Sequence, residues 1–81
     1  MASVEERVKQ VIAARLGADP AKLTGEARFV EDLGAESMQS IELVAAFEAE
    51  FDIEMDEDAA LEVKTVGNAI AFISKAVEEQ G

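Results

Sequence analysis

Ser37 is the residue whose type and position best suit a chemical role, because it follows Gly34-Ala35-Glu36 and directly precedes an apolar, helix-like stretch. It cannot act alone as a triad-type nucleophile, since the chain contains no His to serve as its base and no Cys as an alternative thiol. Another enzyme would have to activate its hydroxyl. A phosphate on that oxygen would lie near a helix N-terminus, which favours anions. The alternative is a structural N-cap, whose hydroxyl accepts a hydrogen bond from the first turn.

The clustered acids offer weaker chemistry. Glu31 and Asp32 could support acid–base catalysis only in a pocket that perturbs their titration, and solvated carboxylates are the ordinary alternative. The acidic run from Asp52 to Asp58 invites comparison with a calcium loop, which needs Gly at its sixth position and Glu at its twelfth. This chain has Glu57 and Val63 there. The sequence therefore predicts neither an enzyme nor a specific metal site.

The charge of the chain is strongly acidic and segregated. The 81 residues include 7 basic and 18 acidic ones, a net charge of −11, and no basic residue lies between Arg28 and Lys64, whereas 12 of the acids do. Such a surface repels nucleic acid and anionic lipid and attracts proteins with basic patches. No apolar run reaches the roughly 18 residues of a membrane span, and the acidic N-terminus is unlike a signal or transit peptide. We expect a cytoplasmic protein that binds neither nucleic acid nor membranes.

The apolar periodicity predicts a first helix that Ser3 and Glu6 cap and that stops at Gly17. A long connection over 18–36 follows, with a short turn expected at Asp19-Pro20, and long ordered loops are often functional. The stripe of the first helix comprises Val4, Val8, Val11, Ile12 and Leu16. The expected apolar anchors of the connection are Leu23, Phe29, Val30 and Leu33.

Three more helices are predicted. One runs over about 38–51, a short and irregular one lies in the acidic stretch 56–62, and Thr65 caps the last. The stripe of the last helix comprises Val66, Ala69, Ile70, Ile73 and Val77. Strand signals are nearly absent, and the length leaves room for one compact domain. We therefore expect a single all-α domain over 1–81.

The helix predicted over 38–51 is apolar on two faces at 100° per residue. The core stripe comprises Ser40, Leu43, Val44, Phe47 and Phe51. The second stripe comprises Met38, Ile41, Ala45 and Ala49, flanked by Glu42 and Glu48. A helix of this kind is either buried all round or presents one stripe to a partner. The flanking glutamates and the small size of the bundle favour a partner.

Four segments are distinctive when taken together. They are Phe29-Val-Glu-Asp-Leu-Gly-Ala-Glu-Ser37-Met, Ile41-Glu-Leu-Val, Phe47-Glu-Ala-Glu-Phe-Asp52 and Lys64-Thr-Val66. With the capped first helix they closely resemble the bacterial acyl carrier proteins of dissociated fatty acid synthesis, over about 4–77. In that family the serine of an Asp-Ser-Leu signature is joined through a phosphodiester to 4′-phosphopantetheine. The matching serine here is Ser37.

This resemblance implies a four-helix bundle, with a long loop between its first two helices and a short third helix, that holds acyl groups as thioesters on the arm. A holo-synthase (a phosphopantetheinyl transferase) would attach 4′-phosphopantetheine from coenzyme A. The acyl chain would fold back among the helices against Leu43, Phe47 and Ile70. A monomer would dock on basic patches of acyltransferases and ketosynthases through Glu36, Met38, Ile41, Glu42, Ala45 and Glu48.

Departures from the family pattern bear on the pathway. The signature reads Glu36-Ser37-Met38, and Gln39 and Ala49 stand where the fatty acid carriers usually have acids. These changes favour a carrier dedicated to a special lipid or a polyketide over the housekeeping fatty acid carrier. The alternative function is a carrier-like interaction module in which Ser37 is only a helix cap.

Overall fold

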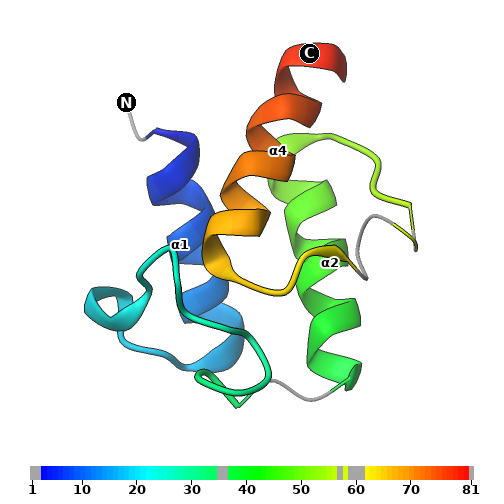
Figure 1. Cartoon of the computed structure of the whole chain (residues 1–81). Coiled ribbons are helices and arrows are strands. Elements are labelled where there is room, and N and C mark those ends of the chain that lie inside the picture. Colours follow the sequence, from blue (N-terminus) through cyan, green and yellow to red (C-terminus); the bar gives the residue numbers. More distant parts are fainter. Residues whose placement is uncertain (1–2, 35–36, 57, 59–61, 81) are drawn as a thin grey trace.

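The computed structural model describes residues 3–34, 37–56, 58 and 62–80. Within them the elements in order are α1 (Val4–Leu16), the 3₁₀ helix η1 (Pro20–Lys22), α2 (Ser37–Phe51) and α4 (Val66–Gln80). α2 and α4 run opposite to α1, so α1 begins and α4 ends at one end of the bundle, whereas α2 begins at the other end (Figure 1). The expected all-α fold, with a long loop after the first helix, is confirmed.

The remaining element expected from the sequence falls between α2 and α4. The short third helix expected over 56–62 lies largely outside the described residues, which include only Asp56, Asp58 and Glu62 of that stretch. In the described part of the chain no strand forms, but an isolated antiparallel bridge pairs Arg28 with Thr65. This bridge lies between the long connection and the start of α4.

The ends of α1 form at the residues that the sequence indicated. The amide of Glu6 donates a 3.1 Å hydrogen bond to Ser3 Oγ, which satisfies one of the N–H groups that a helix leaves unpaired at its start. Gly17 ends the helix at φ 65°, a left-handed conformation in which glycine has no Cβ clash. Val8 and Ile12 have no exposed surface. The predicted stripe therefore faces the core.

The long connection is anchored on the core, although one predicted anchor is wrong. Leu23 and Phe29 are buried, and Leu33 is partly buried against the core. Val30, however, is 63% exposed. Because Phe29 and Leu33 are four residues apart in a turn, their side chains can share its inner side, and the residue beside Phe29 then points outward.

The connection also holds the first turn of α4. The amides of Val66 and Gly67 donate to the carbonyl oxygens of Ala27 and Gly25, each at 2.9 Å. The predicted cap is confirmed, since Thr65 Oγ1 accepts a 3.0 Å hydrogen bond from the amide of the third helical residue. The N–H groups at the start of α4 are thus satisfied largely by the connection.

The end of α2 is fixed by a second set of contacts. Asp52 takes the left-handed conformation, with φ 54°, and the amide of Ile53 donates back to the carbonyl oxygen of Glu48 at 3.2 Å, as in a Schellman motif. Arg7 of α1 donates from Nη2 to the carbonyl oxygen of Glu50 at 2.7 Å. α1 therefore caps the C-terminal end of α2.

A common hydrophobic core joins the three long helices and the connection. Its buried members are Val8, Ile12, Leu23, Ala27, Phe29, Leu43, Phe47, Ile53, Val66, Ala69, Ile73 and Ala76. Most of them belong to the stripes expected from the sequence. Ala27, Ile53 and Ala76 were not among the expected core residues, because a single small or isolated apolar residue carries little periodic signal.

Candidate functional site

Ser37 is the first residue of α2 and therefore lies at the end of the bundle opposite the start of α1 (Figure 1). The N-cap alternative expected the helix to begin just after Ser37, whereas it begins at Ser37 itself. The preceding Glu36 lies outside the described residues. Because the first amides of a helix have no intrahelical partners, Ser37 lies where an attached anionic group is favoured.

The chain approaches α2 through a turn that begins at Arg28 and ends at Leu33. The amides of Asp32 and Leu33 both donate to the carbonyl oxygen of Arg28 at 3.0 Å. The turn is also held to the body of the protein, since the buried Phe29 donates its amide to the carbonyl oxygen of Lys64 at 3.1 Å. The turn is therefore closed within itself and anchored to the segment that precedes α4.

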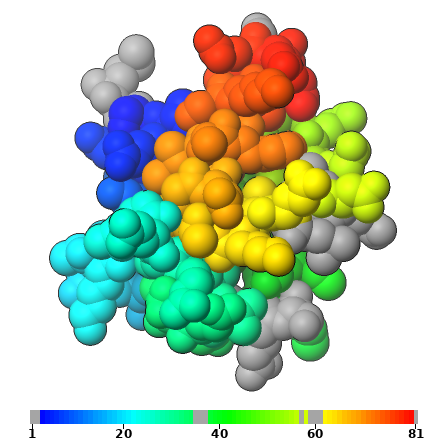
Figure 2. Space-filling view, viewed as in Figure 1, coloured from blue at the N-terminus to red at the C-terminus, as the bar shows by residue number. Residues whose placement is uncertain are grey.

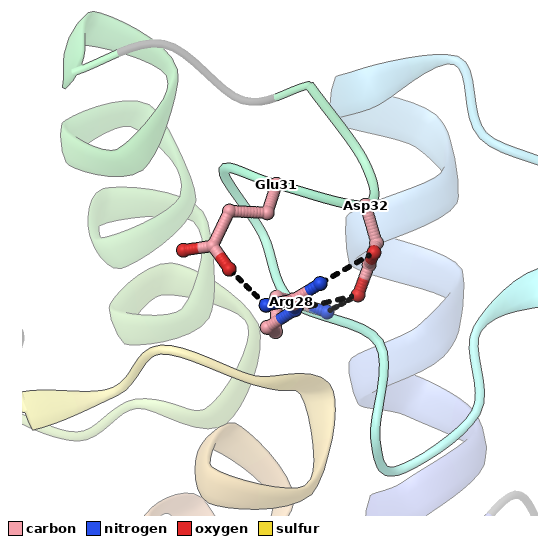
Figure 3. Close-up of polar contacts among 3 residues, drawn as sticks. All are labelled: Arg28, Glu31 and Asp32. Atoms are coloured by element: carbon pink, nitrogen blue, oxygen red, sulfur yellow. Dashed lines mark hydrogen bonds and ion pairs between the residues drawn. The ribbon is translucent and has the colours of Figure 1, made fainter.

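Arg28, Glu31 and Asp32 form a cluster on this turn that we call the Arg28 clamp (Figure 3). The carboxylate of Asp32 accepts from the amide of Arg28 at 2.9 Å, from its Nε at 3.1 Å and from its Nη2 at 3.3 Å. Glu31 forms an ion pair with the same guanidinium. The hydrogen bonds from the side chain and the amide of Arg28 hold the pKa of Asp32 below its usual range.

Gly34 lies between the Arg28 clamp and the start of α2. Its φ of 68° is in the left-handed region, which favours glycine. A Cβ atom on Gly34 would meet no atom within 4 Å. Its requirement for glycine is therefore conformational rather than steric, and a side chain there would strain the path into α2.

The second stripe of α2 is exposed. Met38 and Ile41 are 73% and 70% exposed, the highest values among the large hydrophobic residues in the described part of the chain, and Ala45 is also exposed. Glu42 is exposed beside them. The alternative in which this helix is buried all round is therefore wrong.

Glu48 differs from the other predicted partner-binding residues in the described part of the chain. Its side chain is half-buried, and its Oε2 accepts a 3.3 Å hydrogen bond from the amide of Met55. This bond holds the segment after α2 against the helix. Glu48 therefore has an intramolecular role that its spacing along the helix did not indicate.

The chain matches a known protein family over most of its length. Residues 6–73 match the protein family described as "Phosphopantetheine attachment site". The chain is 49% identical over 75 residues to the acyl carrier protein of Caulobacter vibrioides (strain NA1000 / CB15N), and the aligned segment covers 93% of this chain and 96% of that protein. It is 51% identical over 75 residues to the acyl carrier protein of Phenylobacterium zucineum (strain HLK1), with 93% and 95% covered. The chain belongs to the acyl carrier proteins.

Acyl carrier proteins are carriers rather than catalysts, and their attachment domain takes 4′-phosphopantetheine. They act with synthase and transferase enzymes, and their usual role is in fatty acid biosynthesis. The expected family, cofactor and carrier function are thereby confirmed. No helix in the part of the chain that the structure describes is long and apolar enough to cross a membrane.

The residues expected to line an acyl site come together in this acyl carrier protein. Leu43 and Phe47 are 3% and 2% exposed, and Ile70 of α4 is partly buried and packs against the same core. An acyl chain entering between α2 and α4 would meet these side chains. Because protein cores are close-packed, such a chain could enter only if the two helices moved apart.

Ala49 and Gln39, the two positions of α2 where the fatty acid carriers usually have acids, have different surroundings. Ala49 is exposed and lines an open groove between α1 and α2 together with Val11, Ala14 and Ala46. Gln39 is half-buried near the start of the helix. An acid at position 49 would add a negative charge to this groove, which Arg15 and Glu50 also line.

The Arg28 clamp was not among the predicted features, although the sequence contains a signal for it. Opposite charges three and four residues apart can meet where the chain turns helically. Arg28 precedes Glu31 and Asp32 by these spacings. Because the connection was expected to be a long loop with a short turn only at Asp19-Pro20, a helical spacing after Arg28 carried no prediction.

Proposed function

We propose that Ser37 accepts the 4′-phosphopantetheine arm. The observation that carries this proposal is the position of Ser37 at the start of α2, four residues after the end of a turn that is held to the body of the protein. The sequence around it, Glu36-Ser37-Met38, resembles the attachment signature of the family. The whole chain, 1–81, would act as a single carrier domain.

The surroundings suit such a group. The phosphate would lie by the N-terminus of α2, whose partial positive charge favours it. Met38, the next residue, is exposed, so an arm can leave this end of the helix towards solvent. In the transfer, the Ser37 oxygen would form a bond to the phosphorus of the pantetheine phosphate, and the pyrophosphate bond of coenzyme A would break and release adenosine 3′,5′-bisphosphate. A base on the transferase would take the hydroxyl proton, since this chain has no His.

When bound, the arm supplies a terminal thiol that holds acyl groups as thioesters. We propose that Leu43, Phe47 and Ile70 line the space for the acyl chain, because they are apolar, Leu43 and Phe47 of α2 belong to the core, and Ile70 of α4 packs against that core. Opening this space would expose apolar surface, and burial of the acyl chain would offset that cost.

We further propose that partners bind the exposed stripe of α2. Met38, Ile41 and Ala45 provide the apolar contact, and the acids Glu36, Glu42 and Glu48 guide basic patches towards it. The expected partners are a holo-synthase, acyltransferases and ketosynthases, and the protein would act as a cytoplasmic monomer. Glu42, which is exposed, is placed to contribute more to partner binding than Glu48, whose carboxylate is already hydrogen-bonded.

A second candidate is a carrier dedicated to a special lipid or a polyketide. It is favoured by Ala49, which leaves an exposed position of α2 without the acid usual in the fatty acid carriers. Gln39 likewise removes a charge near Ser37. Both changes would alter which basic partners bind well while leaving the loading of Ser37 possible.

The attachment is tested by intact mass after incubation with coenzyme A and a broad-specificity phosphopantetheinyl transferase. One phosphopantetheinyl mass should be added, and Ser37→Ala should abolish the addition. Ser40→Ala is the matched control, because Ser40 lies one turn further along α2 and its variant should still load. Modification that persists in Ser37→Ala would place the arm on another residue and overturn the assignment, whereas no modification of the unaltered protein would favour the interaction-module alternative.

A further inference from the structure

Arg28 occupies an isolated position in the charge pattern of the chain. It is the last basic residue before Lys64, and the acids Glu31 and Asp32 follow it three and four residues later. The structure shows that Arg28 binds both acids, although all three side chains remain accessible, at 55%, 59% and 42% exposure. The contacts therefore form an exposed clamp on the turn that leads to Ser37 (Figure 3).

We propose that Arg28 is a positioning residue for the modification of Ser37. By holding Asp32 and Glu31 it keeps the turn closed and presents the start of α2 in the orientation that the transferase accepts. The inference rests on the proposed function, because the process it concerns is the loading of Ser37.

The geometry supports this role because Arg28 closes the turn through its backbone and its side chain together. Its carbonyl oxygen accepts the amides of Asp32 and Leu33, and its own amide and guanidinium donate to the Asp32 carboxylate. Loss of the side-chain bonds would therefore loosen the same residues that the backbone bonds hold. A loosened turn spends less time in the binding-competent form, which raises the apparent KM in proportion.

Closure of the turn matters more because Gly34, the residue after it, adds no side-chain contact. Gly34 has no side chain that could touch neighbouring atoms and takes a left-handed conformation. In the described chain, the nearest anchors on the N-terminal side of α2 are thus Leu33, which packs against the core, and the Arg28 clamp itself. The direction in which the chain leaves the turn is set by these contacts.

A different explanation for any effect of Arg28 is its charge alone. If charge mattered, removing Arg28 would make the protein more acidic and would speed encounter with a basic transferase, while neutralising Asp32 would slow it. If positioning matters, both changes open the same turn and slow loading. The two explanations therefore predict opposite changes in the rate of loading when Arg28 is removed.

The experiment measures kcat/KM for phosphopantetheinylation of the full chain by the broad-specificity transferase and coenzyme A. The variants are Arg28→Met, Asp32→Asn, the double variant and Arg28→Lys. Lys9→Met is the matched control, because it makes the same change of charge and removes a partly exposed ion pair, from Lys9 Nζ to Glu5 Oε1 at 3.3 Å, on α1. Hydrogen exchange at the amides of Asp32 and Leu33 reports closure of the turn independently of loading.

We expect Arg28→Met and Asp32→Asn each to lower kcat/KM roughly threefold to fivefold, the size of effect that an exposed ion pair contributes. The double variant should be no worse than the worse single variant, and Arg28→Lys should recover part of the loss. Exchange at both amides should quicken in the slow variants. Lys9→Met should not slow loading.

Opposite effects of the two single variants, or losses that multiply in the double variant, would overturn the proposal. So would unchanged loading in Arg28→Met when exchange shows that the turn has opened. These failures are distinct from failure of the proposed function, in which the unaltered protein would not load at Ser37 at all.

Discussion

The amide of Gly67 donates a 2.9 Å hydrogen bond to the carbonyl oxygen of Gly25, and a Cβ atom on Gly67 would lie 2.7 Å from that oxygen. The two backbones can approach this closely only because Gly67 lacks a side chain. The contact holds the long connection against the first turn of α4, and Figure 2 shows these two segments packed together.

Gly67→Ala should therefore destabilise the protein. In a helix without such a contact, the change from Gly to Ala stabilises by up to about 1 kcal/mol. Here the methyl group meets backbone atoms, and we expect a loss of roughly 1–3 kcal/mol, as for other overpacked sites. Urea denaturation measures the free energy of unfolding. Gly25→Ala is the control, since its Cβ atom would lie 3.9 Å from the nearest atom, Gly67 Cα; a Gly67→Ala variant more stable than the unaltered protein would contradict the close approach.

The core should depend strongly on Phe47. This side chain is 2% exposed, and truncation of a buried Phe costs about 3–5 kcal/mol, much of the stability that a small domain has. Phe47→Ala should be largely unfolded at low salt by circular dichroism. Ala49→Glu, on the exposed stripe, should fold nearly normally, and similar losses in both variants would show that the faces of α2 were assigned wrongly.

The Arg28 clamp should be sensitive to acid. Because Arg28 holds the pKa of Asp32 below its usual range, the Asp32 carboxylate stabilises the fold above the usual aspartate pKa, and this contribution is lost as the pH falls through the lowered pKa. Titration of the Asp32 carboxyl carbon by NMR should give a midpoint below the usual range. In Arg28→Met the midpoint should rise towards that range; an unchanged midpoint would mean that Arg28 does not cause the shift.

Stability should rise with salt. A net charge of −11 on a small domain favours expansion, and salt screens that repulsion. The melting temperature should increase from low to moderate NaCl, and a gain of about 1 kcal/mol would correspond to roughly 4–8 °C. Mg²⁺ or Ca²⁺ should act more steeply at equal ionic strength. A flat response would mean that the acids are too widely spaced for their repulsion to matter.

Partner selection should depend on Gln39 and Ala49. The comparison is the rate of acyl loading and elongation by a standard dissociated fatty acid synthase, for the unaltered protein and for the Gln39→Asp/Ala49→Glu double variant. We expect the double variant to be faster at low salt, because the added acids strengthen electrostatic guidance, and the difference to shrink as salt rises. If the unaltered protein already matches a housekeeping carrier, the specialised alternative is excluded.

The helices were predictable because their periods and caps are local. The stripe of α1 could be assigned from spacing alone, and the caps at Ser3, Gly17 and Thr65 formed as expected. The second stripe of α2, with Met38 and Ile41, also followed from periodicity, and its exposure was favoured by the flanking glutamates and the small size of the bundle. In each case the signal lies within one or two helical turns of sequence.

The remaining features depend on contacts that a local pattern does not contain. Val30 was expected to be buried because it is apolar. It is exposed, and the sequence of a turn does not show which way a single apolar side chain points. The approach of Gly25 to Gly67 joins residues far apart in the sequence and involves backbone atoms. The intramolecular bond of Glu48 to the amide of Met55 depends on how the chain folds back after α2.

The opposite directions of the helices leave both ends of the described chain far from the proposed attachment residue. α1 starts and α4 finishes at the end of the bundle remote from Ser37 (Figure 1). A tag, fluorophore or surface linker attached near Ser3 or Gln80 would therefore leave the arm and the N-terminal part of α2 unobstructed. The C-terminal side needs more care, because the Gln80 side chain makes two hydrogen bonds with the backbone of Glu54. A fusion there should retain Gln80 and begin with a flexible spacer.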